Sequence, residues 1–172
     1  SGGHLLGLMR GFAELEREGL IPAYPLIVGV QAAGCAPLVR AFDAGRPTWE
    51  RWEGARTIAH AIANPTPPAG DAVLRTIRER EGILVAVSDE DMLAAQRELA
   101  AAEGLFCQPE SATTLAALRK LAAAGKIDEG RGATVLVLTG SGLKAPAALE
   151  TAPIEIHRVP LAELETGLAR LF

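Results

Sequence analysis

Three short apolar runs rich in β-branched residues divide this chain of 172 residues, and helical patterns lie between them. The runs are residues 25–30, 83–87 and 134–138, and each is nearly continuous in its hydrophobicity. Such runs are typical of strands that are covered on both faces in a parallel sheet. The order helix, strand, helix, strand, helices, strand therefore predicts an α/β fold with three α-β-α layers and a mostly parallel sheet.

Helix-end signals support this division of the chain. Apolar residues recur at helical spacing from Leu5 to Leu15, and Gly19 follows as a stop. Residues 88–91, Ser-Asp-Glu-Asp, predict a capping box with acidic side chains in the first helical turn. The remaining predictions are helices at 37–42, 56–62, 72–80 (capped by Asp71), 92–102 (ended by Gly104), 109–124 (ended by Gly125) and 161–171, and an edge strand at 154–159.

Composition argues against several classes of partner. The net charge is −4 and the pI is near 5.4, so the chain lacks the basic surface that follows a nucleic-acid backbone. Its apolar runs are too short to span a bilayer, and we expect a soluble, cytoplasmic protein that binds neither nucleic acid nor membrane. The cysteines and histidines show no metal-ligand spacing, which predicts that the chain has no metal site. These residues are Cys35, Cys107, His4, His60 and His157, and we expect the two cysteines to be ordinary buried thiols.

Two glycine-containing turns are candidates for binding chemistry. Ser1, Gly2 and Gly3 precede a predicted helix, where glycines allow close approach of an anion and the first free N–H groups face its charge. At a chain terminus, the same turn also fits a cloning remnant. Residues 139–142, Thr-Gly-Ser-Gly, directly follow a predicted strand, where parallel sheets bind ligands, although a plain turn is the alternative. The spacing excludes a nucleotide P-loop.

Four separated segments, taken in order, resemble the pyridoxal-phosphate enzymes of the tryptophan synthase β fold, also called fold type II. Within that fold, they resemble threonine synthase. Residues 29–39, GVQAAGCAPLV, are similar to the family pattern GxQAxGxAPLV, and residues 57–65, TIAHAIANP, to TxAxAI followed by NP. Residues 104–118 and 138–144 are similar to GIFxEPASAAxxAGL and LTGxGLKD. Residues 1–4 align with the GNxGN phosphate loop of the family.

The resemblance implies residue roles that composition and spacing do not supply. Ser1, Gly2, Gly3 and His4 are expected to hold the phosphate of pyridoxal phosphate, mainly through backbone N–H groups. Thr139 is expected to hydrogen-bond the pyridine nitrogen. In this family the Schiff-base lysine lies upstream of the phosphate loop, so no catalytic residue is expected among Lys120, Lys126 and Lys144, which are the only lysines of the chain.

Several positions depart from the family pattern. His4 stands where the family usually has asparagine. Ser141 stands where the family often has histidine or asparagine. Gln108-Pro109-Glu110 replaces Glu-Pro-Ala, and Ala145 stands where aspartate is expected. These departures bear on the substrate more than on the cofactor.

The resemblance implies that the chain is the C-terminal portion of a threonine synthase-like enzyme. Such an enzyme converts O-phosphohomoserine and water to threonine and phosphate. We expect residues 1–145 to form the C-terminal part of the catalytic region and residues 146–172 to form an extension packed on it. The expected partners are a phosphorylated amino acid, the missing N-terminal portion and a second copy in a homodimer. The alternatives are a serine/threonine dehydratase-like or sulfur-transferring enzyme of the same fold, or a non-catalytic module that binds a phosphorylated ligand.

Overall fold

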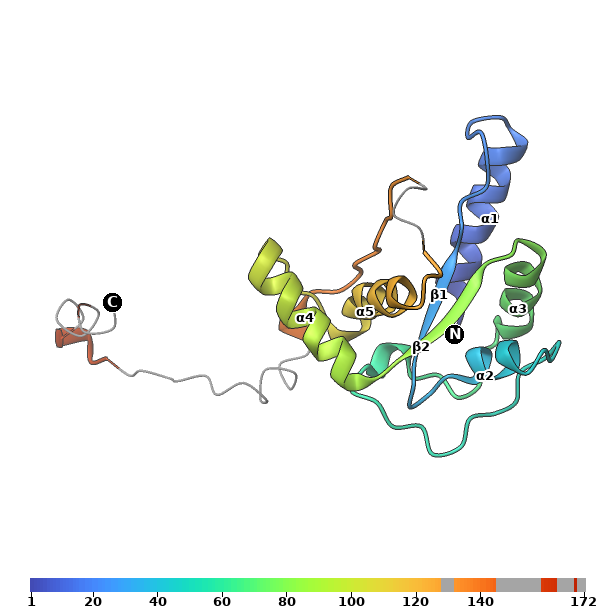
Figure 1. Ribbon diagram of the computed structural model, residues 1–172. Helices are drawn as coiled ribbons and strands as arrows, with labels where there is room; N and C mark the ends of the chain where they lie inside the picture. Colours follow the sequence, from blue (N-terminus) through green and yellow to red (C-terminus); the bar gives the residue numbers. More distant parts are fainter. Residues whose placement is uncertain (128–131, 145–158, 164–168, 170–172) are drawn as a thin grey trace.

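A computed structural model describes residues 1–127, 132–144, 159–163 and 169 (Figure 1). Its helices and strands alternate as the sequence predicts over the first two apolar runs. In chain order they are α1 (Gly3–Arg17), β1 (Val28–Ala32), α2 (Pro37–Asp43), the 3-10 turn η1 (His60–Ile62), α3 (Gly70–Glu79), β2 (Ile83–Val87), α4 (Asp89–Glu103), α5 (Pro109–Ala123) and the 3-10 turns η3 (Gly142–Lys144) and η5 (Leu161–Glu163).

β1 and β2 pair in parallel, in a register that sets Val28 opposite Ile83 and Ala32 opposite Val87. Helices cover both faces of this pair, with α1, α2 and α3 on one face and α4 and α5 on the other (Figure 1). Alternate residues of β2 serve the two layers, because successive strand side chains point to opposite faces. Val85 and Val87 pack with α4 and α5, whereas Leu84 packs with the other layer. The predicted α/β class with three layers is confirmed.

Local sequence signals account for several helix ends. Ser88 and Asp91 form the predicted capping box of α4, in which the Ser88 hydroxyl accepts from the Asp91 N–H at 3.1 Å. Gly104 ends α4 with φ 66°, a conformation that glycine adopts at little cost. The N-terminus of α2 is capped by a residue of another element: the Gln31 side chain on β1 accepts from the N–H groups of Leu38 (2.9 Å) and Val39 (3.1 Å).

The predicted third strand at 134–138 is wrong for this structure. These residues have no regular secondary structure, and two side chains expected to be buried are open to solvent, Val135 at 80% and Val137 at 40% exposure. A strand needs a hydrogen-bonded neighbour, and the sheet formed by the described residues consists of β1 and β2 alone.

The predicted helix at 56–62 is also wrong, since only η1 is helical there. Tertiary partners take the backbone donors of this segment: the Arg56 N–H donates to the Gly34 carbonyl at 3.2 Å, and the Ile58 N–H donates to Asp89 at 3.0 Å. Asp71 lies in the first turn of α3, whose N-cap is Ala69. The predicted edge strand and terminal helix after residue 153 fall largely outside the described residues, although residues 161–163 form η5.

Two glycines of the protein provide opposite tests of this packing. A Cβ atom at Gly34 would overlap the carbonyl group of Arg56, whereas a Cβ at Gly11, in the exposed middle of α1, would meet no atom within 4 Å. We expect Gly34→Ala to lower the free energy of unfolding by about 1–3 kcal/mol through overpacking. Gly11→Ala should raise it by about 0.5–1 kcal/mol through helix propensity. Urea unfolding monitored by circular dichroism measures both, and equal stabilities of the two variants would contradict the close approach at Gly34.

Candidate functional site

The glycine turn at residues 1–4 is held against the start of α3. Gly2 is the N-cap of α1 and has φ 81°, a left-handed conformation that strains other residues. The Ser1 carbonyl accepts from the Ala69 N–H at 3.2 Å, and a Cβ at Gly2 would lie 3.1 Å from a methyl group of Val73. Both the conformation and the close contact therefore require glycine at position 2.

The N-terminus of α1 is open to an incoming group. The first intrahelical hydrogen bond runs from the Leu6 N–H to the Gly2 carbonyl at 2.9 Å, so the N–H groups of Gly3, His4 and Leu5 precede it. Gly3 and His4 are exposed, and no atom lies within 4 Å of a Cβ built on Gly3. Free N–H groups at the positive end of a 15-residue helix fit a phosphate.

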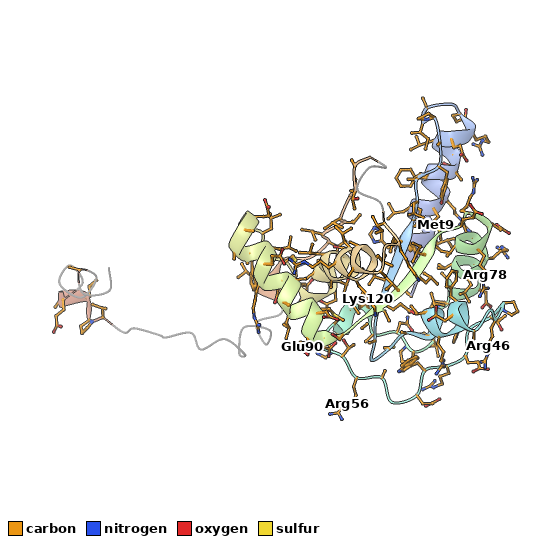
Figure 2. All side chains as sticks on the ribbon, in the orientation of Figure 1. Met9, Arg46, Arg56, Arg78, Glu90 and Lys120 are labelled. Atoms are coloured by element: carbon orange, nitrogen blue, oxygen red, sulfur yellow. The ribbon has the colours of Figure 1, made fainter. Side chains whose placement is uncertain are left out.

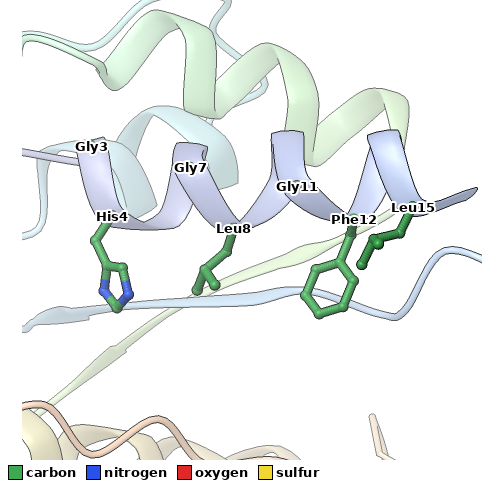
Figure 3. Close-up of a pocket in the computed structure, with 7 residues that line it drawn as sticks. All are labelled: Gly3, His4, Gly7, Leu8, Gly11, Phe12 and Leu15. Carbon is green, nitrogen blue, oxygen red and sulfur yellow. The ribbon is translucent and has the colours of Figure 1, made fainter.

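A groove continues from this turn along α1 (Figure 3). It has a volume of about 400 Å³ and is lined by α1 residues alone, with three glycines one turn apart beside larger side chains: Gly3, Gly7, Gly11, His4, Leu8, Phe12 and Leu15. The His4 imidazole points to the same side of the helix as Leu8 and Phe12 (Figure 3). His4 is thus next to the free N–H groups, at one end of an apolar groove.

Thr139 is placed by a short antiparallel bridge that the sequence did not predict. Cys107 and Ser141 pair, with the Gln108 N–H donating to the Gly140 carbonyl at 2.9 Å and the Gly142 N–H donating to the Phe106 carbonyl at 3.0 Å. A Cβ at Gly140 would overlap the Gln108 side chain, which explains the glycine in this turn. The bridge holds residues 139–142 against the start of α5.

Ser111, in the first turn of α5, contacts Thr139 directly. Its hydroxyl oxygen lies 3.0 Å from the N–H donors of both Thr139 and Gly140, and 3.2 Å from Thr139 Oγ1. Ser111 is 2% exposed, whereas Thr139 is exposed. The sequence pattern at 108–111 is compatible with lining a site but is explained more simply by a helix start, and it did not reveal this contact. The one signal was the serine that this segment shares with the family pattern EPASA.

Two departures from the family pattern, Gln108 and Glu110, have structural roles. Gln108 contacts the glycine turn as described above, and Glu110 accepts from the Ala61 N–H at 3.0 Å, which ties η1 to the start of α5. The other carboxylate oxygen of Glu110 is buried without a hydrogen-bond partner.

A second pocket, of about 460 Å³, lies where the chain leaves β2. Thr57 Oγ1 donates to Asp89 Oδ1 at 2.5 Å, and Asp89 Oδ2 accepts from the Ile58 N–H. Arg56 and His60 also line the pocket. Asp89 thereby holds the loop at the carboxyl end of the sheet, where ligands of parallel sheets bind.

The two predicted halves of the cofactor site belong to different parts of the fold. Residues 1–4 contact the start of α3, and Thr139 contacts the start of α5, on the opposite side of the β1–β2 pair. Among the described residues, hydrogen bonds do not join the two halves directly. Each half of the predicted cofactor site is therefore held by contacts within its own helical layer, residues 1–4 in the layer of α3 and Thr139 in the layer of α5.

The lysines and cysteines occupy ordinary environments. Lys120 reaches from α5 toward β2, where its Nζ donates to the Ala86 carbonyl at 2.8 Å (Figure 2), and Lys126 and Lys144 are exposed. Cys35 and Cys107 are buried as predicted, and burial raises the pKa of each thiol. In the part of the chain that the structure describes, no cluster of three or more His, Cys, Asp or Glu residues could hold a metal ion, and no helix has the length and apolar character for a membrane span.

Similar proteins are pyridoxal-phosphate enzymes. The threonine synthase of Methanosarcina acetivorans is 39% identical over 145 residues, which are 84% of this chain and 35% of that protein. The threonine synthase of Mycobacterium tuberculosis is 35% identical over 176 aligned positions, which span 97% of this chain and 45% of that protein. The chain thus spans less than half the length of these curated relatives.

Solved structures agree on the fold. A threonine deaminase from T.th. is 31% identical, has a TM-score of 0.55, and matches 71% of this chain and 41% of its own. A fungal L-serine ammonia-lyase from Rhizomucor miehei matches 99% of this chain and 47% of its own with a TM-score of 0.63; at 18% identity this likeness shows the fold alone.

A sequence profile described as pyridoxal-phosphate dependent enzyme matches residues 1–140, which include the first glycine turn and the start of the second. The predicted family and its cofactor, pyridoxal phosphate, are thereby confirmed. On the matched profile and the threonine synthase relatives, this chain belongs to the pyridoxal-phosphate dependent enzymes of fold type II.

Proposed function

We propose that this chain is the C-terminal portion of a threonine synthase-like enzyme that converts O-phosphohomoserine and water to threonine and phosphate. The observation that carries this proposal is similarity at 35–39% identity to threonine synthases across 84–97% of the chain. The geometry supports the cofactor half of the proposal, because an open helix N-terminus and a fixed, exposed hydroxyl provide the two kinds of contact that pyridoxal phosphate requires.

Residues 1–4 are proposed to hold the cofactor phosphate. The N–H groups of Gly3 and His4 precede the first helical hydrogen bond, and the absence of a side chain at Gly3 leaves the space beside them open. Ser1 adds a hydroxyl at the mouth of the same turn, and Gly2 sets its backbone conformation. The four residues thus act together: His4 and Gly3 provide backbone donors, Gly2 and Gly3 leave space for the phosphate, and α1 contributes the positive end of its dipole.

Thr139 is proposed to donate a hydrogen bond to the pyridine nitrogen. Pyridoxal phosphate, when bound, supplies an electron-withdrawing ring conjugated to the substrate's amino group. A neutral hydroxyl beside the ring nitrogen leaves that nitrogen largely unprotonated, which an aspartate would not do. The role of Thr139 is therefore to orient the ring while tempering its electron withdrawal.

The rest of the enzyme is proposed to supply the lysine that carries the cofactor, in an N-terminal portion that precedes the phosphate turn. Val135 and Val137 support a missing partner, because their apolar side chains, in a segment without regular secondary structure, are exposed at 80% and 40%. Within this chain, we assign residues 1–145 to the catalytic region and 146–172 to an extension. By family resemblance, the enzyme is proposed to be a cytoplasmic homodimer.

The second candidate is a dehydratase-like activity on serine or threonine. The 31% identity to a threonine deaminase favours it over other reactions of the fold. A non-catalytic module that binds a phosphorylated ligand would use the same α1 N-terminus, but it would not need a fixed hydroxyl at Thr139.

Activity on O-phosphohomoserine tests the choice between these functions. We expect the enzyme that contains this chain to release inorganic phosphate from O-phosphohomoserine, and to form threonine in equal amount, as measured by a coupled phosphate assay and amino-acid analysis. Ammonia release from serine or threonine, without turnover of the phosphorylated substrate, would instead support the dehydratase-like enzyme.

The chain's own lysines are expected not to carry the cofactor. Lys120, Lys126 and Lys144 are all exposed, and the Lys120 amine already donates a hydrogen bond to the Ala86 carbonyl, so none has the enclosed setting of a cofactor-bound amine. After incubation of the chain with pyridoxal phosphate and reduction with borohydride, mass spectrometry should show no stoichiometric adduct at one lysine. A single fully modified lysine would show that the chain holds its own catalytic amine.

A charge change at Gly3 tests the phosphate turn. We expect Gly3→Asp in the enzyme that contains this chain to weaken pyridoxal phosphate binding about tenfold relative to Gly3→Asn, because a carboxylate would repel the phosphate. The two variants have nearly equal side-chain size, and aspartate near a helix N-terminus favours the helix, so a loss of folding does not explain the difference. Fluorescence titration measures both affinities. Pyridoxal without its phosphate should bind both variants equally, and an equal affinity of the two variants for pyridoxal phosphate would contradict the assignment.

A further inference from the structure

We propose that Ser111 is a positioning residue that directs the hydroxyl proton of Thr139 outward, toward an acceptor nitrogen of the ligand. This inference rests on the proposed function, in which Thr139 faces the pyridine nitrogen of pyridoxal phosphate. It adds a second residue, buried and out of reach of the ligand, that favours Thr139 as a donor to the ligand.

The hydrogen-bonding capacity of the Ser111 hydroxyl is used completely. A serine hydroxyl has one proton and two acceptor lone pairs. The N–H groups of Thr139 and Gly140 both donate to Ser111 Oγ at 3.0 Å, and these two bonds occupy its lone pairs. Its third neighbour is Thr139 Oγ1 at 3.2 Å, and Ser111 can approach that oxygen only as a donor.

The usual outlet for a serine proton in a helix is not used here. Helical serines and threonines commonly donate to the carbonyl three or four residues earlier. Thr113 and Thr114 do so in α5, to the carbonyls of Glu110 (2.6 Å) and Ser111 (2.8 Å). Two carbonyls correspond to these positions for Ser111. The Gln108 carbonyl already accepts from the N–H groups of Ser111 and Ala112, and the Cys107 carbonyl accepts from the Gln96 side chain at 2.6 Å. The Ser111 proton therefore goes to Thr139.

The consequence for Thr139 is a proton with no acceptor in its own loop. Ser111 cannot accept it, and Thr139 is exposed. An acceptor atom of a ligand satisfies this proton. A ligand donor would have to use the one lone pair that Ser111 leaves on Thr139 Oγ1, and the Thr139 proton would then need another acceptor. The arrangement thus favours an unprotonated ring nitrogen over a protonated one, which would present a second donor.

Serine fits position 111 better than other residues do. The side chain is 2% exposed, so the extra methyl of threonine would have to be accommodated in a packed site, and alanine would strand two backbone N–H groups. The cysteine thiol is only a weak donor and a weak acceptor.

The test is the nitrogen-15 resonance of ring-labelled pyridoxal phosphate in the holoenzyme, read in single and double variants. Thr139→Val removes the hydroxyl at nearly constant shape, and its resonance should move toward that of an unprotonated ring without a hydrogen bond. Ser111→Ala should move the resonance in the same direction. In the Thr139→Val background it should cause no further movement, because the effect of Ser111 passes through Thr139. Cofactor affinity should fall roughly three- to tenfold in each single variant.

Thr114→Val is the matched control, since it removes a hydroxyl from the same helix whose bond is to the backbone. It should leave the resonance unchanged. A second measurement needs no cofactor: amide exchange at Thr139 and Gly140 should accelerate in Ser111→Ala and stay slow in Thr139→Val, which keeps the Ser111 acceptor. If Ser111→Ala does not retain the cofactor, Ser111→Cys replaces it and should shift the resonance part of the way.

The outcomes separate the role of Thr139 from the role of Ser111. If Thr139→Val leaves the ring resonance at its wild-type position, the proposed role of Thr139 fails. If Thr139→Val shifts the resonance and the Ser111 variants do not, or if Ser111→Ala shifts it equally with and without Thr139, the cofactor contact stands and the positioning role of Ser111 is overturned.

Discussion

The parallel pairing of β1 with β2 is the contact on which the rest of the described structure depends. Parallel strands cannot be joined by a tight turn, so the chain must cross over between them, here through α2 and α3. Both faces of the pair are apolar and need cover, which α1, α2 and α3 provide on one side and α4 and α5 on the other. The loops that leave the strands, including the one anchored by Asp89, consequently gather at one edge.

Polar side chains then connect this framework across long sequence distances. Gln31 on β1 caps α2, and Asp89 at the start of α4 holds the loop around Thr57. Ser111 at the start of α5 holds the turn that carries Thr139. In each case, a helix end or loop with unmatched backbone donors is completed by an acceptor from a neighbouring element, because buried N–H groups without partners are costly. The candidate cofactor contacts are thus built by the same bonds that stabilise the fold.

Sequence reasoning predicted most of the regular elements. The apolar run 83–87 coincides with β2, and the capping box at Ser88 and the stop at Gly104 are where the pattern placed them. It failed at 134–138, where the apolar pattern is typical of a strand but no neighbouring strand among the described residues pairs with the segment. It failed again at 56–62, because the competing tertiary hydrogen bonds of that segment leave no trace in its own periodicity.

By itself, the sequence determined the α/β class, the helix boundaries that depend on local caps, and the motifs that identify a pyridoxal-phosphate enzyme. These follow from short-range patterns of hydrophobicity, capping and glycine. Only the tertiary structure decided that Gln108 and Ser111 contact the turn that carries Thr139. It also decided that Glu110 ties η1 to the start of α5. Such roles depend on contacts between donors and acceptors that are far apart in the sequence; Ser111 and Thr139, for example, are 28 residues apart. A local sequence pattern does not show which distant residues will be neighbours in the folded chain.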